Sequence, residues 1–166
     1  MSPDPGRTLY AAYIKDQLDA QEARKSSLEQ RGLAVITTAG ALVTLLFGLT
    51  ALSTTRAATF EIPSAASTFL TFALVFFVLA ALSALLTNLP RSYQGVTVDA
   101  LRDAVKDRWD DTEAVASKMV ALTQLKVLAS AKEVNTQKGY FLIAGMVFEI
   151  IAVALVGVAM GIVIWD

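Results

Sequence analysis

Residues 139–165 read GYFLIAGMVFEIIAVALVGVAMGIVIW, an apolar run in which Glu149 is the only charged residue. A helix needs about 20 predominantly apolar residues to cross the hydrocarbon core of a bilayer, so this run is long enough to span a membrane. Two further runs have the same character: residues 32–55 carry no charge, and residues 68–89 form the densest part of a second uncharged stretch. The sequence therefore predicts an all-α protein with three transmembrane helices.

The composition of the 166-residue chain supports the membrane class, because only 17% of its residues are charged and 55% are hydrophobic. A soluble domain carries about 25% charged residues. The chain has no Cys and no His, which excludes disulfides, zinc sites of the Cys/His type and His-based catalytic triads. It also has no Gly-rich phosphate loop, and its net charge is −1. We therefore expect no enzymatic activity, no cofactor, no metal and no nucleic-acid partner.

Lys and Arg residues are distributed unequally among the segments that flank the spans. Residues 1–31 contain five of them and residues 90–138 contain eight, whereas the loop 56–67 contains one and the C-terminal end contains none. Positively charged flanking segments tend to stay in the cytoplasm. The distribution predicts a multi-pass protein of the cytoplasmic (inner) membrane, with its N-terminus inside, its C-terminus outside and residues 56–67 in an external loop.

Both cytoplasmic segments are expected to be helical, because apolar residues recur in them at helical spacing. Residues 1–31 form one N-terminal helix, which is expected to continue into the first span. Residues 90–138 form a helical hairpin, in which Thr97 predicts the N-cap of a short helix over 97–109. A second helix over 112–138 is expected to run straight into the third span. Together these segments predict a small cytoplasmic helical bundle.

The turn of this hairpin carries Trp109 beside Arg108. Trp109 extends the apolar stripe of the short helix, so one interpretation is that its ring caps the core of the bundle. The other interpretation is that Trp109 and Arg108 contribute to a partner or ligand site at the tip. The sequence leaves both open.

Glu149 is the residue of the spans that is most informative about function. It lies nine residues beyond Tyr140, and therefore about 14 Å into a hydrocarbon core about 30 Å thick. A carboxylate at that depth costs several kcal/mol and normally faces a bundle interior, a pore or a partner. Glu149 is predicted either to serve a proton relay, a cation pathway or the sensing of assembly, or to be a protonated structural group that hydrogen-bonds Thr44 or a backbone carbonyl.

Small residues form faces for close packing on two of the spans. Gly40, Thr44 and Gly48 fall on one ridge of the first span, and Gly157 and Gly161 form a GxxxG motif in the third. Such faces let helices approach closely, which drives helix association in lipid. They predict either packing of helices within one chain or self-association into a homo-oligomer.

One stretch and the overall layout resemble known membrane proteins. Residues 24–48, RKSSLEQRGLAVITTAGALVTLLFG, resemble a group of uncharacterised actinobacterial integral membrane proteins. More loosely, the layout is similar to the Pycsar-type and SLATT-type membrane effectors of bacterial antiphage systems, which place a cytoplasmic helix before the first span. That similarity implies a protein that responds to a small-nucleotide signal by oligomerising and breaching the inner membrane.

Three functions are consistent with these features. The first is a non-enzymatic effector that oligomerises and perturbs the bilayer or conducts ions, with Glu149 lining or gating the assembly. The second is a membrane-anchored scaffold whose cytoplasmic bundle recruits a partner. The third is a small proton-coupled transporter that uses Glu149, although three spans without an internal repeat do not favour a transporter.

Overall fold

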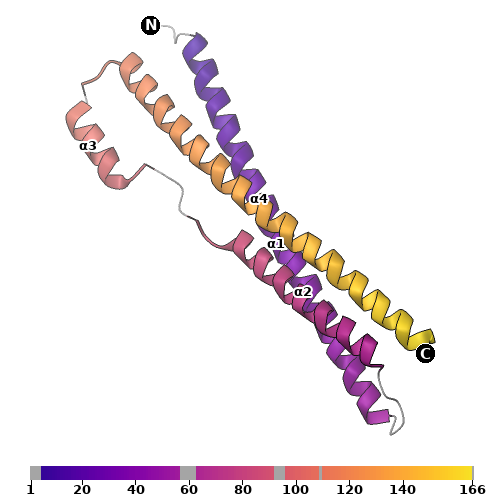
Figure 1. Ribbon diagram of the computed structural model, residues 1–166. Helices are drawn as coiled ribbons and strands as arrows, with labels where there is room; N and C mark the ends of the chain where they lie inside the picture. The colour runs from indigo at the N-terminus through magenta and orange to yellow at the C-terminus, as the bar shows by residue number, and fades with distance from the viewer. Residues whose placement is uncertain (1–4, 57–62, 92–95, 109, 166) are drawn as a thin grey trace. The chain divides into compact units, whose positions relative to one another are not determined.

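The computed structural model describes residues 5–56, 63–91, 96–108 and 110–165 of the chain. These ranges contain four helices and no strand (Figure 1). The helices are α1 (Pro5–Arg56), α2 (Ser64–Asn88), α3 (Val98–Arg108) and α4 (Glu113–Trp165). The predicted all-α class is therefore confirmed.

Three of the helices are long and apolar enough to cross a membrane: α1 over Gly6–Gly48, α2 and α4. The prediction of three apolar helices long enough to cross a membrane is therefore confirmed. Helix α1 continues from the polar N-terminal segment into the first span, and α4 likewise runs into the third span. Helix α2 begins at Ser64, directly after Pro63 and four residues before the predicted start of the second span. Half of the predicted external loop, residues 57–62, lies outside the described residues, while Arg56 belongs to α1 and residues 64–67 to α2.

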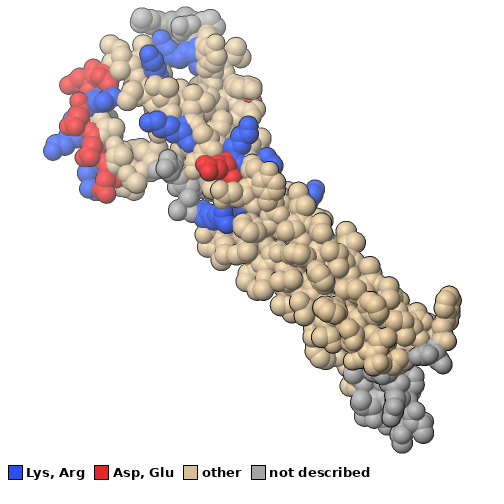
Figure 2. Space-filling view, viewed as in Figure 1, with Lys and Arg blue, Asp and Glu red and all other residues tan. Residues whose placement is uncertain are grey.

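The chain divides into two compact units. The polar unit consists of Met1–Ser27 and Pro90–Gln137, and the apolar unit consists of Leu28–Leu89 and Lys138–Asp166. In Figure 2 the Lys, Arg, Asp and Glu side chains on the visible face gather over the polar unit.

Small buried side chains dominate the core of the apolar unit. On α2 the buried residues follow each other at intervals of three, four or seven positions, as in the seam of a coiled coil. These buried residues are Ala66, Ala73, Phe77, Ala80, Ala84 and Thr87. Three of them, Phe77, Ala80 and Ala84, meet Val35 and Ala39 of α1 and Leu142 and Ala152 of α4 in two hydrophobic clusters. Alanine at these positions lets three helices approach closely, which is how helices associate in lipid.

Two helices supply the buried residues of the polar unit. Ile14 of α1 and Ala131 and Asn135 of α4 are buried there. An ion pair joins Arg7 to Glu113 at 3.9 Å, but Glu113 is largely exposed, so this pair contributes little to stability.

Helix α3 contributes no buried residue to the polar unit. Thr97 caps it as predicted, because its Oγ1 accepts a hydrogen bond from the Ala100 backbone N–H at 3.3 Å. The predicted burial of the α3 stripe in a three-helix bundle is not found among the described residues: Val98 and Leu101 are 75% and 56% exposed. Trp109, predicted at the turn after α3, lies outside the described residues.

Candidate functional site

The predicted intramembrane carboxyl lies in the seam between α1 and α4. Thr38 of α1 and Glu149 of α4 are hydrogen-bonded, with Thr38 Oγ1 2.5 Å from Glu149 Oε1. Glu149 is half-buried, and it is the only Asp, Glu, Lys or Arg residue between Gly139 and Trp165. An interhelical hydrogen bond of this kind is favourable in lipid, because no water is available there to hydrogen-bond an unpaired polar group.

The Thr38 hydroxyl can serve either protonation state of this carboxyl. Oγ1 also lies 2.9 Å from the backbone oxygen of Ala34 and 3.2 Å from that of Val35. A hydroxyl has one proton to donate and two lone pairs to accept with. An ionised Glu149 accepts that proton, whereas a protonated Glu149 donates to Oγ1 and leaves Thr38 to donate to Ala34. The Thr38 hydroxyl therefore lies within hydrogen-bonding distance of both Glu149 on α4 and the backbone of its own helix.

Thr44, the partner predicted for Glu149, makes a different bond. Its Oγ1 donates to the backbone oxygen of Gly40 at 2.9 Å, within its own helix. The prediction of a hydroxyl opposite Glu149 named the right helix, but the hydroxyl is Thr38. Thr37, the neighbour of Thr38, donates instead to the backbone oxygen of Leu33 in its own helix at 2.9 Å.

The four glycines of the predicted association faces do not contact other helices of the described chain. A Cβ atom built at Gly40, Gly48, Gly157 or Gly161 would meet nothing within 4 Å. Packing between the described helices therefore does not use these faces. They remain open on the surfaces of α1 and α4.

Close approach within the chain depends on two other glycines. A Cβ on Gly145 of α4 would lie 3.2 Å from the backbone oxygen of Ala80 on α2. A Cβ on Gly32 of α1 would lie 2.8 Å from Nδ2 of Asn88 and 3.3 Å from the backbone oxygen of Ala84. Gly32 and Gly145 thus let α1 and α4 approach the backbone of α2.

A buried ion pair that we did not predict lies near the start of the third span. Nζ of Lys138 is 2.6 Å from Oε1 of Glu29, and the Lys138 side chain is 1% exposed. The backbone oxygen of Lys138 accepts a hydrogen bond from Thr87 Oγ1 of α2 at 3.5 Å. Lys138 therefore links α4 to both α1 and α2. An ammonium group so deeply buried is costly unless it is paired.

In the polar unit, Asn135 of α4 bonds Gln21 of α1. Its Nδ2 donates to the backbone oxygen of Gln21 at 2.8 Å and lies 3.2 Å from Gln21 Oε1. Asn135 is fully buried, and its Oδ1 has no hydrogen-bond partner among the described residues. A single buried Asn in a helical seam is a known device for fixing which residues pair, at a cost in stability.

Arg108, predicted to join Trp109 in a partner or ligand site, is the last residue of α3 and is exposed. Metal binding was not expected, and no group of three or more Asp, Glu, His or Cys side chains that could hold a metal ion occurs among the described residues.

Sequence reasoning missed Thr38, Lys138, Glu29 and Asn135 as interhelical contacts. One pattern in α4 could have found two of the four, Asn135 and Lys138. Positions 131, 138, 145, 152 and 159 of α4 recur every seven residues, and all are buried. Asn135 lies four residues after the first of these positions and Lys138 is the second, while Glu149 lies four residues after Gly145. Reading this seam would have placed Asn135, Lys138 and Glu149 on the packed face of α4.

Comparison of the chain with protein-family models, with curated proteins and with solved structures finds no match.

Proposed function

We propose that the protein is a non-enzymatic effector of the inner membrane, which self-associates in the bilayer and makes it permeable to ions. The observation that supports this proposal is that no other described helix packs against the glycine faces of α1 and α4. No atom of another described helix lies within 4 Å of a Cβ position built at Gly40 or Gly48 on α1, or at Gly157 or Gly161 on α4. Faces of this kind drive helix association in lipid, so they are available to a second copy of the chain.

Glu149 supplies the polar group that a permeation pathway needs. Most of the residues packed around that seam are small or apolar, so the carboxyl is kept at a cost to insertion. In the proposed assembly the carboxyls of several copies line or gate a common path. Thr38 holds each carboxyl against α1 until the copies come together.

The proposal includes the orientation expected from the Lys and Arg distribution, with the polar unit in the cytoplasm. Reporter fusions after Pro63, Val127 and Asp166 test it. An external signal at the first and last sites and a cytoplasmic signal at Val127 are expected. Any other pattern contradicts the three-span topology on which the effector role depends.

A role in antiphage defence, triggered by a small-nucleotide signal, rests on the similarity of layout to the Pycsar-type and SLATT-type effectors.

A scaffold is the second candidate, and one observation favours it. A groove of about 850 Å³ runs between α3 and α4 of the polar unit, lined on the α4 side by Met119, Val120 and Val127 among others. A helical partner could lie in such a groove. A scaffold needs neither the open glycines nor the carboxyl at Glu149, so it predicts that substitutions there leave function unchanged.

The glycine faces are tested by changing them to a bulky residue. Replacing Gly157 and Gly161 together by Ile blocks close approach on α4, and the detergent-solubilised species is expected to fall to a smaller mass. Val158→Ile is the matched control, because Val158 is an exposed residue of the same helix that already has a bulky side chain. An unchanged mass for a folded G157I/G161I variant would count against self-association through this face.

A further inference from the structure

A hollow of about 240 Å³ lies among the three helices of the apolar unit. All the side chains that line it are apolar, and they include Leu42 and Leu46 of α1, Phe77 of α2, and Val153 and Val156 of α4. Phe77 is 1% exposed, whereas Val153 is 49% exposed. The hollow therefore reaches from the surface of the apolar unit to its core.

The position of this hollow in the sequence determines what can enter it. Its lining residues on α1 and α4 belong to the uncharged run 32–55 and the apolar run 139–165, which are the predicted membrane-crossing segments. An apolar cavity of about 150 Å³ inside a protein stays dry and binds benzene. A hollow of about 240 Å³ therefore has room for an apolar group of that size, which would arrive through the lipid.

The only charged residue of the third span lies one helical turn from this hollow. Val153 follows Glu149 by four residues on α4, and Leu42 follows Thr38 by four residues on α1. At 1.5 Å per residue, the hollow thus begins about 6 Å beyond the Thr38–Glu149 hydrogen bond. At 3.6 residues per turn, Glu149, Val153 and Val156 also fall within about 60° of one another around α4. The carboxyl and the hollow therefore lie on the same side of α4.

The Glu149 carboxyl has one oxygen available for a ligand. Its Oε1 lies 2.5 Å from Oγ1 of Thr38, while its Oε2 has no hydrogen-bond partner among the described residues. An ionised carboxyl accepts hydrogen bonds at both oxygens. Charged groups inside a membrane normally pair with one another. An ammonium group would complete this site, because an ammonium and a carboxylate together carry no net charge.

We propose that the hollow binds a lipophilic amine, a molecule with a small apolar body and one amino group. The apolar body lies against Phe77, and the ammonium donates to Oε2 of Glu149 while Oε1 keeps Thr38. When a neutral amine meets a protonated carboxyl, the proton moves from Glu149 to the amine nitrogen and the site gains no net charge. A phospholipid fits less well, because its headgroup stays at the membrane surface, about 14 Å from the depth of Glu149.

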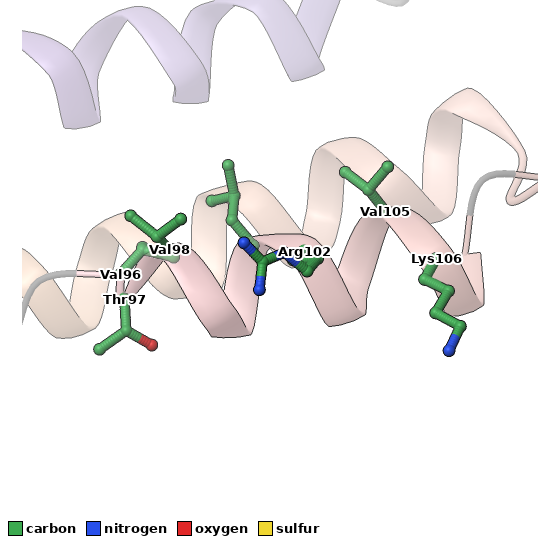
Figure 3. Close-up of a pocket in the computed structure, with 7 residues that line it drawn as sticks. Val96, Thr97, Val98, Arg102, Val105 and Lys106 are labelled. Atoms are coloured by element: carbon green, nitrogen blue, oxygen red, sulfur yellow. The ribbon is translucent and has the colours of Figure 1, made fainter.

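The hollow along α3 (Figure 3) does not define its occupant in this way. Arg102 and Lys106 line it together with Val98 and Val105, and Arg102 pairs with Asp99 at 3.4 Å. Charges of both signs therefore border that apolar face. In the apolar unit, by contrast, a single acidic group lies beside an apolar hollow.

Two photoreactive probes test the proposal on the full-length chain in phosphatidylcholine vesicles. One is a trifluoromethyldiazirinyl benzylamine and the other is the corresponding benzyl alcohol, so the probes share an apolar ring and differ in the amino group. Mass spectrometry of the digested protein locates the labelled residues. We expect the amine to label residues of the hollow saturably and several-fold more strongly than the alcohol does.

Three variants assign this labelling to the carboxyl and to the hollow. Glu149→Gln should reduce labelling by the amine to the level of the alcohol, because Gln cannot ionise. Glu133→Gln is the matched control, since Glu133 is an exposed residue of the same helix before the apolar run, and it should leave the labelling unchanged. Val156→Phe narrows the hollow and should reduce labelling by both probes several-fold.

Equal and unsaturable labelling by the two probes would overturn the proposal, because it would show simple partitioning from the lipid. Labelling that is absent in vesicles but present in dilute detergent would mean that a second copy of the chain fills the hollow, and it would overturn the proposal too. The inference uses Glu149 but needs no self-association. A protein that binds the amine without leaking ions would contradict the effector role alone, and one that leaks ions without binding the amine would contradict this inference alone.

Discussion

Oε1 of Glu149 lies 2.5 Å from Oγ1 of Thr38, so the only acidic group of the third span is tied to the first span. The bond joins two helices that both run from the polar unit into the apolar unit. It also gives the carboxyl a partner that can accept or donate. This combination of a costly group and an adaptable partner is what distinguishes the site from a packing contact.

Thr38→Val is expected to destabilise the protein, because the isosteric Val removes the hydroxyl and leaves the half-buried carboxyl without its partner. Leaving such a group unsatisfied costs about 1–3 kcal/mol. Thermal unfolding in detergent measures the loss. Thr37→Val is the matched control, since the Thr37 hydroxyl bonds only its own helix at Leu33 among the described contacts. Equal effects of the two substitutions would argue that the Thr38–Glu149 bond contributes nothing.

Glu149→Gln and Glu149→Leu separate a functional carboxyl from a structural one. Gln keeps the shape and the hydrogen bonding but cannot ionise, so it should leave stability nearly intact while abolishing ion leakage or growth arrest on overexpression. Leu should be at least as stable as the parent, because it removes an insertion penalty of about 2.5–3.5 kcal/mol, the range for charged residues at a helix centre. Full activity in both variants would show that the Glu149 carboxyl has no part in the mechanism, and it would favour the scaffold function.

Lys138→Met should be among the most destabilising single substitutions in the apolar unit. The substitution leaves Glu29 without its ion-pair partner, because it removes the ammonium group of Lys138, whose side chain is 1% exposed. Breaking a buried pair from one side costs about 3–5 kcal/mol, and the low end applies here because Glu29 is 34% exposed. Lys132→Met, at an exposed position of the same helix, should change the midpoint of unfolding little.

A double variant shows whether the charge or the packing matters at this pair. Replacing Glu29 by Leu together with Lys138→Met removes both charges, and much of the lost stability should return, since apolar residues can replace a buried pair at little cost. If the double variant is as unstable as Lys138→Met alone, the loss of stability does not come from the unpaired charge of Glu29.

Gly145→Leu should push α2 and α4 apart, because even a Cβ at Gly145 would lie 3.2 Å from the backbone oxygen of Ala80. Overpacking of this kind typically costs about 1–3 kcal/mol. Gly161→Leu is the control on the same helix. Nothing lies within 4 Å of its Cβ position, and replacing a helical glycine favours the helix by up to about 1 kcal/mol. Unfolding of the monomer in dilute detergent should separate the two variants, and equal midpoints would contradict this packing.

The three membrane-length helices could be predicted from sequence because each contains a long apolar run with at most one charged residue, and length and hydrophobicity are what a membrane-crossing helix needs. The continuity of α1 through Gly32 and of α4 through Gly139 was also predictable, since neither glycine is accompanied by proline. The N-cap at Thr97 followed from local chemistry. These features depend on residues close together along the chain.

The helix contacts could not be predicted because they depend on which residue of one helix faces which residue of another. Glu149 was recognised from its depth, but the choice between Thr38 and Thr44 depends on how far α1 is shifted along α4. The glycines of the recognisable motifs are not packed against another described helix. The close contacts with α2 occur instead at Gly32 and Gly145. Lys138 counted only as one of the charges that set orientation, yet its ammonium is buried.

Ion leakage from vesicles, measured as a function of the protein-to-lipid ratio, tests the proposed function most directly. If copies must assemble to open a path, the leak rate should rise more steeply than in proportion to the ratio. The G157I/G161I variant should flatten that rise by several-fold, whereas Val158→Ile should not. A leak that is absent at every ratio, or that grows only in proportion to the protein and ignores the glycine substitutions, would contradict a self-associating membrane effector.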